Sequence, residues 1–332
     1  MIRRLLPVLA ITSLLLLGYL LGPRHELVEP APLGAIPNSP LALEEYLAAS
    51  ERGAADIVPG AEKALLWAHD DRRRTPLAIV YLHGFSATRQ EMAPLTEQLA
   101  AELGANLFLT RLSGHGQNPS AMGRVSATDW LRDTLEAYEI GLAIGERVIV
   151  VGASTGGTLA LWLAERVPRE SLAALLLISP NLGPRDSRAM WLAGPWGRQL
   201  AELMLGEEYR WTPSNDLHAR YWNWRYPTRA LVPMMALVRT VRDSDLEGIN
   251  VPTLMLYSPA DRVVDPAQIE TAFARVGERA APLAYKRLLT IEDSQDPSSH
   301  VLAGDILAPR DTARVRQHLL EFLAAMPAAA IL

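Results

Sequence analysis

Short apolar runs alternate with longer amphipathic stretches along most of the chain. Six of the runs have the length and composition of buried β-strands: 77–82, 106–112, 147–151, 173–179, 253–258 and 283–291. Five stretches with a helical spacing of apolar residues lie between or after them: 94–103, 126–142, 155–166, 266–277 and 311–325. Strands that are apolar on both faces and alternate with helices are typical of a mostly parallel sheet covered on both sides. The pattern therefore predicts the α/β class.

Two local signals refine this pattern. An apolar run at 64–69 is separated from the strand at 77–82 by the charged turn DDRRR, which predicts a β-hairpin between the two. Ser126 and Asp129 have the spacing of a capping box, so the following helix is expected to begin at about Ser126.

The stretch from Asn181 to Gly248 breaks the alternation, because it contains no clean strand pattern. Five of the eight tryptophans fall inside it: Trp191, Trp196, Trp211, Trp222 and Trp224. An insertion of this composition after a strand predicts a helical cap, at about 182–247, over the carboxyl edge of the sheet. Most of these aromatic side chains are expected to pack the cap onto the body, and one or two to line an acyl-binding cleft.

The N-terminal 22 residues have the pattern of a membrane anchor. Arg3 and Arg4 precede an uncharged apolar run at 5–22, which reaches the lower length limit for a helix that crosses a bilayer. The positive-inside bias then places the N-terminus in the cytoplasm and the rest of the chain on the extracytoplasmic, or periplasmic, side. A cleaved signal peptide, with secretion of the rest, and a buried core helix are the alternatives.

The segment at 23–40 carries five prolines and little apolar periodicity, so it is expected to be a semi-extended tether. The remaining residues, 41–332, suit one large domain that includes the cap. The formal net charge of −5 gives no basic surface for nucleic acid, and the absence of cysteine excludes disulfides, thiolate metal sites and cysteine nucleophiles.

A serine stands between glycines where the strand at 147–151 meets the helix at 155–166. The residues GASTG at 152–156 match the GxSxG nucleophile elbow, in which a tight strand-to-helix turn pushes the serine side chain out of the sheet. Gly152 and Gly156 relieve crowding in that turn, and the helix N-terminus directs amide donors at a developing oxyanion. Ser154 is therefore the predicted nucleophile.

A serine hydroxyl needs a base and an orienting carboxylate, which follow it in the order Asp or Glu, then His, in chains with this elbow. Asp261 comes just after the strand at 253–258, and His300 follows the strand at 283–291. Both lie at predicted carboxyl ends of strands. The alternatives for the carboxylate are Asp265, Asp293 and Asp296. His218 in the cap and His318 in the last helix are the other histidines of this half of the chain.

The oxyanion requires a second amide besides that of Thr155. The strand at 77–82 ends in His83 and Gly84, a turn able to aim the Phe85 amide inward, so Phe85 and Thr155 are the predicted donors. His83 is expected to make structural hydrogen bonds rather than act as a base.

These residues resemble the α/β-hydrolase superfamily, and within it the monoacylglycerol lipase-like and serine aminopeptidase-like bacterial hydrolases. The matching motifs are YLHGFSAT at 81–88, RLSGHGQ at 111–117, GASTGG at 152–157, SPADRVVD at 258–265 and SSHVLAGD at 298–305. The resemblance implies an eight-stranded sheet, a triad of Ser154, Asp261 and His300, and a GHG loop that shapes the site without doing chemistry. Ala153 departs from the histidine that many lipase-like relatives carry there.

Together the residues predict a serine hydrolase that cleaves carboxylic esters, including lipid-like ones, through an acyl-enzyme. A peptidase or amidase and an acyltransferase could use the same triad, and a non-catalytic binding protein is the alternative from another class. No metal or organic cofactor is expected. The expected partners are an ester substrate and, through the N-terminal segment, the membrane; no nucleic acid is expected.

Overall fold

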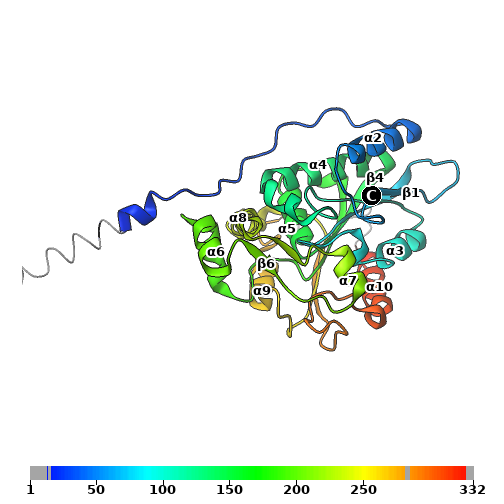
Figure 1. Cartoon of the computed structure of the whole chain (residues 1–332). Coiled ribbons are helices and arrows are strands. Elements are labelled where there is room, and N and C mark those ends of the chain that lie inside the picture. The colour runs from blue at the N-terminus through cyan, green and yellow to red at the C-terminus, as the bar shows by residue number, and fades with distance from the viewer. Residues whose placement is uncertain (1–12, 14–15, 281–284, 327–332) are drawn as a thin grey trace, which may run out of the picture.

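The computed structural model describes residues 13, 16–280 and 285–326, and its centre is one β-sheet (Figure 1). Across the sheet, the order is β1 (Ala64–Leu66), β3 (Asn106–Leu109), β2 (Thr75–Leu82), β4 (Gly145–Ala153), β5 (Leu172–Ile178), β8 (Thr253–Tyr257) and β9 (Lys286–Thr290). Every neighbouring pair is parallel except β1 and β3. The predicted parallel sheet is confirmed, although this sheet has seven strands among the described residues rather than eight.

The predicted hairpin between the first two strands is wrong. β1 pairs antiparallel with β3, with Leu65 opposite Phe108, and not with β2. The reason is that β2 is bonded along both of its edges, by β3 on one side and by β4 on the other. The short strand instead pairs with the outer edge of β3, which β2 leaves open. The charged turn DDRRR therefore crosses the end of the sheet instead of closing a hairpin.

Helices cover both faces of the sheet. Along β4, alternate side chains belong to two separate cores: Val148 and Val150 lie in one, and Ile149 and Val151 lie in the other. The first core is closed by α2 (Pro40–Arg52), α4 (Ala127–Ile144), α5 (Thr155–Ala164), α8 (Leu231–Arg242) and α9 (Pro266–Arg275). The second is closed by α3 (Leu95–Leu103) and α10 (Pro309–Ala324). The period of two along the strand thus produces the two apolar layers.

The helix starts follow the local signals. Ser126 and Asp129 form the predicted capping box of α4, since each side chain accepts a hydrogen bond from the backbone amide of the other. This satisfies two amide groups that would otherwise lack acceptors at the N-terminus of the helix.

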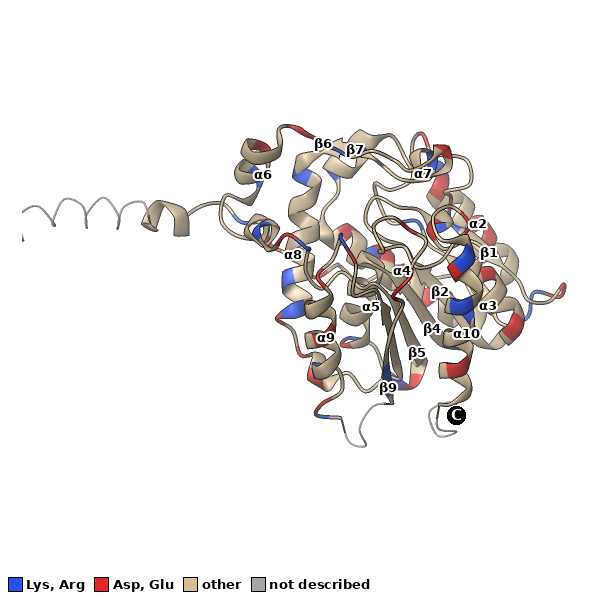
Figure 2. Cartoon of the chain, turned by 90° about the horizontal axis from the view of Figure 1, so that it is seen from below, with Lys and Arg blue, Asp and Glu red and all other residues tan. Residues whose placement is uncertain are grey.

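Between β5 and β8 the chain forms a separate group of short elements at one end of the sheet (Figure 2). In chain order they are η4 (Ser187–Ala193), α6 (Gly197–Leu205), β6 (Glu208–Arg210), α7 (Asp216–Tyr221), β7 (Arg225–Pro227), η5 (Thr228–Ala230), α8 and η6 (Leu246–Gly248). The expectation of no strand here is wrong, because β6 and β7 pair as a two-stranded antiparallel sheet. Trp222 is buried, whereas Trp191 is 67% exposed and Leu203 is 82% exposed.

The predicted anchor falls largely on residues 1–12 and 14–15, which lie outside the described part of the chain. Among the residues that the structure describes, no helix is long and apolar enough to cross a membrane.

The proline-rich segment is extended, as expected, but it is attached to the body of the protein. Leu27 and Ile36 pack against the first core. Glu29 forms an ion pair with Arg166 at 2.8 Å, although 137 residues separate them. The segment is therefore part of the folded surface rather than a free tether.

Candidate active site

Ser154 occupies a strained turn between β4 and α5. Its backbone angles are φ 50° and ψ −117°, a region that residues with a side chain rarely adopt. The turn is held by neighbouring backbone groups, because the Ser154 amide donates to the Ile178 carbonyl at 2.9 Å and the Asn181 amide donates to the Ser154 carbonyl at 2.9 Å. The predicted strand-to-helix turn is therefore present, with Ser154 at its apex.

The two elbow glycines stand where no side chain fits. A Cβ on Gly152 would lie 2.6 Å from the Gly156 carbonyl oxygen. A Cβ on Gly156 would lie 1.9 Å from the backbone oxygen of Leu82, at the end of the neighbouring strand. Both contacts are with backbone, which cannot rotate away as a flexible side chain can. The glycines thus permit the helix to start immediately beside the sheet.

Asp261 and His300 meet in a buried hydrogen bond. Asp261 follows β8, His300 follows β9, and the His300 Nδ1 atom lies 2.7 Å from the Asp261 Oδ2 atom. The other carboxylate oxygen of Asp261 accepts from the amides of Val263 at 2.7 Å and Val264 at 2.9 Å. These contacts orient the carboxylate and leave Nδ1 of His300 as the donor, so Nε2 is the ring nitrogen available as a base.

The pKa of His300 reflects two opposing influences. Burial disfavours the charged imidazolium and by itself lowers the pKa. The charge and hydrogen bond of Asp261, with smaller contributions from Glu91 and Asp296, outweigh that effect and raise the pKa above the ordinary 6.5. A base with this electrostatic support is well suited to accept a proton from a neutral donor.

The alternative carboxylates have other partners. Asp265 caps the N-terminus of α9, where it accepts from the Ala267 amide at 3.1 Å. Asp296 accepts from the backbone amides of His300 at 2.9 Å and Val301 at 3.0 Å, so it fixes the backbone of the loop and not the imidazole. Asp293 is exposed. Of the four candidates, Asp261 is the one whose carboxylate contacts the His300 ring.

The other two histidines considered lie elsewhere. His218 belongs to α7 in the cap, where Nδ1 accepts from the Ser214 amide at 3.2 Å. His318 belongs to α10, with a side chain that is 31% exposed.

The turn after β2 lies directly against Ser154. A Cβ added to Gly84 would be 3.2 Å from the Ser154 Cβ, so the turn packs against the serine side chain. Within the described part of the chain, the amides of Phe85 and Thr155 have no hydrogen-bond acceptor. Two amides without acceptors beside a strained serine suit an oxyanion.

His83 and His115 make structural contacts. His83 is fully buried, its Nε2 atom accepts from the Leu112 amide at 3.0 Å, and its Nδ1 atom lies 2.9 Å from the Gly84 carbonyl oxygen. Burial lowers the pKa of His83 well below its ordinary value and lowers that of His115 to about 4. Both rings are therefore neutral at physiological pH.

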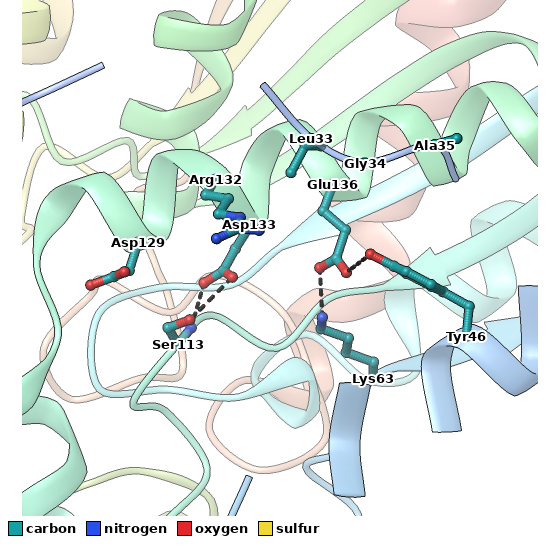
Figure 3. Close-up of a pocket in the computed structure, with 10 residues that line it drawn as sticks. All are labelled: Leu33, Gly34, Ala35, Tyr46, Lys63, Ser113, Asp129, Arg132, Asp133 and Glu136. Carbon is teal, nitrogen blue, oxygen red and sulfur yellow. Dashed lines mark hydrogen bonds and ion pairs between the residues drawn. The ribbon is translucent and has the colours of Figure 1, made fainter. Parts of the chain in front are cut away.

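A separate polar cavity of about 430 Å³ lies between α4 and the N-terminal segment (Figure 3). Two groups of its polar side chains are paired, as Figure 3 shows. Lys63 lies 2.5 Å from Glu136, which also accepts from the Tyr46 hydroxyl at 2.8 Å. Asp133, whose pKa burial raises to about 6, accepts from the Ser113 backbone and side chain. Ser154, Asp261 and His300 do not line this cavity.

One buried acid near the site was missed by the sequence analysis. Glu91 is 3% exposed and bonds to the turn after β2. The surrounding residues, TRQEM at 88–92, read as an ordinary polar helix start, so nothing in the pattern identified this side chain as buried. In the described part of the chain, the histidine, aspartate and glutamate side chains form no cluster arranged to hold a metal ion.

A covered parallel sheet with a serine on a strained strand-to-helix turn, and an Asp–His pair at the ends of later strands, defines the scaffold of an α/β hydrolase. Comparison with known families agrees: residues 79–315 match the alpha/beta hydrolase family. The chain belongs to this family.

Several similar proteins are described as lipases or lipolytic enzymes. A thermostable monoacylglycerol lipase from Bacillus sp. (strain H-257) is 29% identical over 199 residues, which cover 60% of this chain and 76% of the relative. A solved structure of a metagenome-derived lipolytic enzyme, from work on LipS and LipT, is 23% identical with a TM-score of 0.63, covering 82% of this chain and all of that chain. Paleococcus ferrophilus monoacylglycerol lipase is 17% identical with a TM-score of 0.59, covering 79% and 98%. At these identities the two structures establish the fold alone.

Proposed function

We propose that the protein is a serine hydrolase of carboxylic esters, with Ser154 as nucleophile, His300 as base and Asp261 as the group that orients His300. The observation that carries this proposal is the buried 2.7 Å contact between His300 and Asp261, at the same sheet edge as the strained serine. Families built on this scaffold place nucleophile, acid and base in the same chain order.

The reaction proceeds through an acyl-enzyme. His300 takes the proton of the Ser154 hydroxyl, and the serine oxygen attacks the ester carbonyl carbon. The carbonyl oxygen becomes an oxyanion, which the amides of Phe85 and Thr155 stabilise. Collapse of this intermediate expels the alcohol, which receives its proton from His300. Water then attacks the acyl-enzyme with the same histidine as base, and the acid is released.

The substrate is proposed to be an apolar or lipid-like ester. The cap carries large apolar side chains, and monoacylglycerol lipases are among the relatives. A series of p-nitrophenyl esters from acetate to palmitate tests this: the ratio kcat/KM should rise with acyl length beyond butyrate. A maximum at acetate would contradict the lipid-like assignment and leave the serine mechanism unaffected.

A fluorophosphonate probe tests the mechanism directly. The protein should take up one probe per molecule, with the adduct on Ser154, and lose esterase activity in proportion. Ser154→Ala should abolish both labelling and hydrolysis, whereas Ser120→Ala, which alters an exposed serine, serves as a matched control. Active protein that is not labelled at Ser154 would refute the assignment. Aminoacyl amides in the same assay separate an esterase from a peptidase.

The extracytoplasmic location, with attachment through residues 1–22, stays a proposal from the sequence. Fractionation of cells that express the whole chain should recover the protein with membranes, and protease added to spheroplasts should digest the catalytic domain. Recovery in the cytosol with resistance to protease would contradict it.

A further inference from the structure

Glu91, at the end of η1 (Arg89–Glu91), is a buried acid that the proposed reaction does not use. A carboxylate loses favourable hydration when it is buried, so it persists only where donors surround it. Its Oε2 atom accepts from the Gly84 amide at 2.8 Å and from the Tyr81 hydroxyl at 2.8 Å. Both donors belong to the end of β2 and the turn that follows it.

Two glycines place Glu91 close to the other two segments of the site. A Cβ on Gly84 would lie 2.7 Å from the Glu91 Oε1 atom and 3.2 Å from the Ser154 Cβ, so Gly84 is enclosed between the acid and the nucleophile. A Cβ on Gly304, four residues after His300, would lie 2.3 Å from the Glu91 carbonyl oxygen. The acid thus lies where the oxyanion turn, the serine and the histidine loop converge.

The hydrogen bonds around Gly84 fix the direction of the next amide. The Gly84 carbonyl faces His83 Nδ1 at 2.9 Å and accepts from the Ala87 amide at 3.2 Å. In a planar trans peptide, the carbonyl and the following N–H point in opposite directions. The Phe85 amide therefore points away from His83. Glu91 holds the other side of Gly84, through its N–H, so both peptide planes that flank this residue are fixed.

We propose that Glu91 is a positioning residue, whose carboxylate holds the Gly84 amide and thereby keeps the Phe85 amide directed at the oxyanion. The inference rests on the proposed function. Under this proposal Glu91 helps to stabilise the transition state of the reaction, in addition to any contribution to folding.

The test compares variants of Glu91 after titration of active sites with a fluorophosphonate. Glu91→Leu removes the acceptor, and kcat per titrated site with p-nitrophenyl butyrate should fall on the order of 10²-fold, with KM changed by less than about threefold. Glu91→Gln keeps an oxygen that can accept from both Gly84 and Tyr81, so kcat should stay within about tenfold of the wild type.

Glu136→Leu is the matched control, because Glu136 is a buried, paired acid on α4 outside the site. It should lower the melting temperature while kcat per titrated site stays unchanged. If Glu91→Leu does not fold, Glu91→Asp replaces it: the carboxylate is one methylene shorter, and kcat should fall at least tenfold while the charge is retained.

Unchanged kcat per titrated site in the folded Glu91→Leu or Glu91→Asp variant would overturn the proposal and assign Glu91 a structural role. This result is distinguishable from failure of the proposed function, which would appear as a wild-type protein that is neither labelled at Ser154 nor active.

Discussion

The turn after β2 and the loop after β9 each present a buried histidine at the same edge of the sheet, yet the two rings have opposite properties. His83 is enclosed by backbone groups, one donating to Nε2 and one accepting at Nδ1, and burial lowers its pKa far below the ordinary value. His300 is paired with Asp261, and its pKa is raised despite burial.

The pKa values of the two histidines differ because their hydrogen-bond partners differ, and not because one is more deeply buried. A backbone carbonyl and a backbone amide satisfy a neutral ring and leave it no nitrogen to accept a proton. A carboxylate at Nδ1 instead favours the imidazolium and leaves Nε2 free. A histidine near a nucleophile is therefore a candidate base only when one ring nitrogen is uncommitted.

The strongest way to break this comparison is to remove the His300 ring. His300→Ala should lower kcat on the order of 10⁶-fold, because both proton transfers depend on this ring. Steady-state hydrolysis of p-nitrophenyl butyrate measures the loss, with circular dichroism as the control for folding. A folded variant that retains a tenth of the wild-type kcat would rule out His300 as the base.

Removing only the charge of Asp261, the partner of His300, should lower kcat by a smaller factor. Asp261→Asn keeps the size of the side chain but presents an amide to Nδ1, which favours the wrong tautomer, and kcat should fall about 10⁴-fold. Asp265→Asn, at the cap of α9, is the matched control and should keep kcat within about twofold. Equal losses in the two variants would contradict the distinction drawn between these carboxylates.

The corresponding change at the other histidine should lower the stability of the fold. His83→Leu leaves the buried Leu112 amide without an acceptor, so the free energy of unfolding should fall by about 1–3 kcal/mol. Urea titration measures this. His318→Leu, on the partly exposed face of α10, should change it by less than about 0.5 kcal/mol. A His83→Leu loss no larger than that of His318→Leu would refute the structural role.

The smallest effect concerns pH. A base acts only when neutral, so kcat/KM should fall as pH drops through the pKa of His300, with a midpoint above 6.5 because that pKa is raised. Asp296→Asn removes one of the negative charges that raise this pKa and keeps an acceptor for the His300 amide. The midpoint should therefore move to lower pH. A shift to higher pH in the pH–rate profile would contradict the electrostatic account.

The positions of Ser154, Asp261 and His300 after strands could be predicted from the apolar runs that precede them. The runs before Ser154 and Asp261 form the buried ends of β4 and β8, whereas the run before His300 forms β9, KRLLT, which is only partly buried. The position of Glu91 could not be predicted, because its burial depends on the Gly84 amide and the Tyr81 hydroxyl, which reach it only in the folded protein. The periodicity of the sequence predicts which face of a helix or strand a residue lies on. It does not predict which hydrogen-bond donors will surround a buried carboxylate.

For the fold, too, some features could be predicted from the sequence and others could not. The parallel order followed from the alternation of strands and helices, whereas the partner of β1 depended on which strand edge remained open. In the cap, β6 and β7 have three residues each, and β6 is EYR, too short and polar for a strand signal. The N-terminal segment is attached through two isolated apolar residues, Leu27 and Ile36. They form no periodic pattern, so the sequence did not predict this attachment.

That attachment decides where the protein can be shortened for expression. Starting the chain at Leu41, as the composition suggests, would strip Leu27 and Ile36 from the apolar layer and leave Arg166 without Glu29. Such a truncation would expose apolar side chains to water and promote aggregation, although Ser154, Asp261 and His300 would all remain in the chain. A start at or before Pro23, whose carbonyl accepts from the Trp196 amide, keeps these side chains covered.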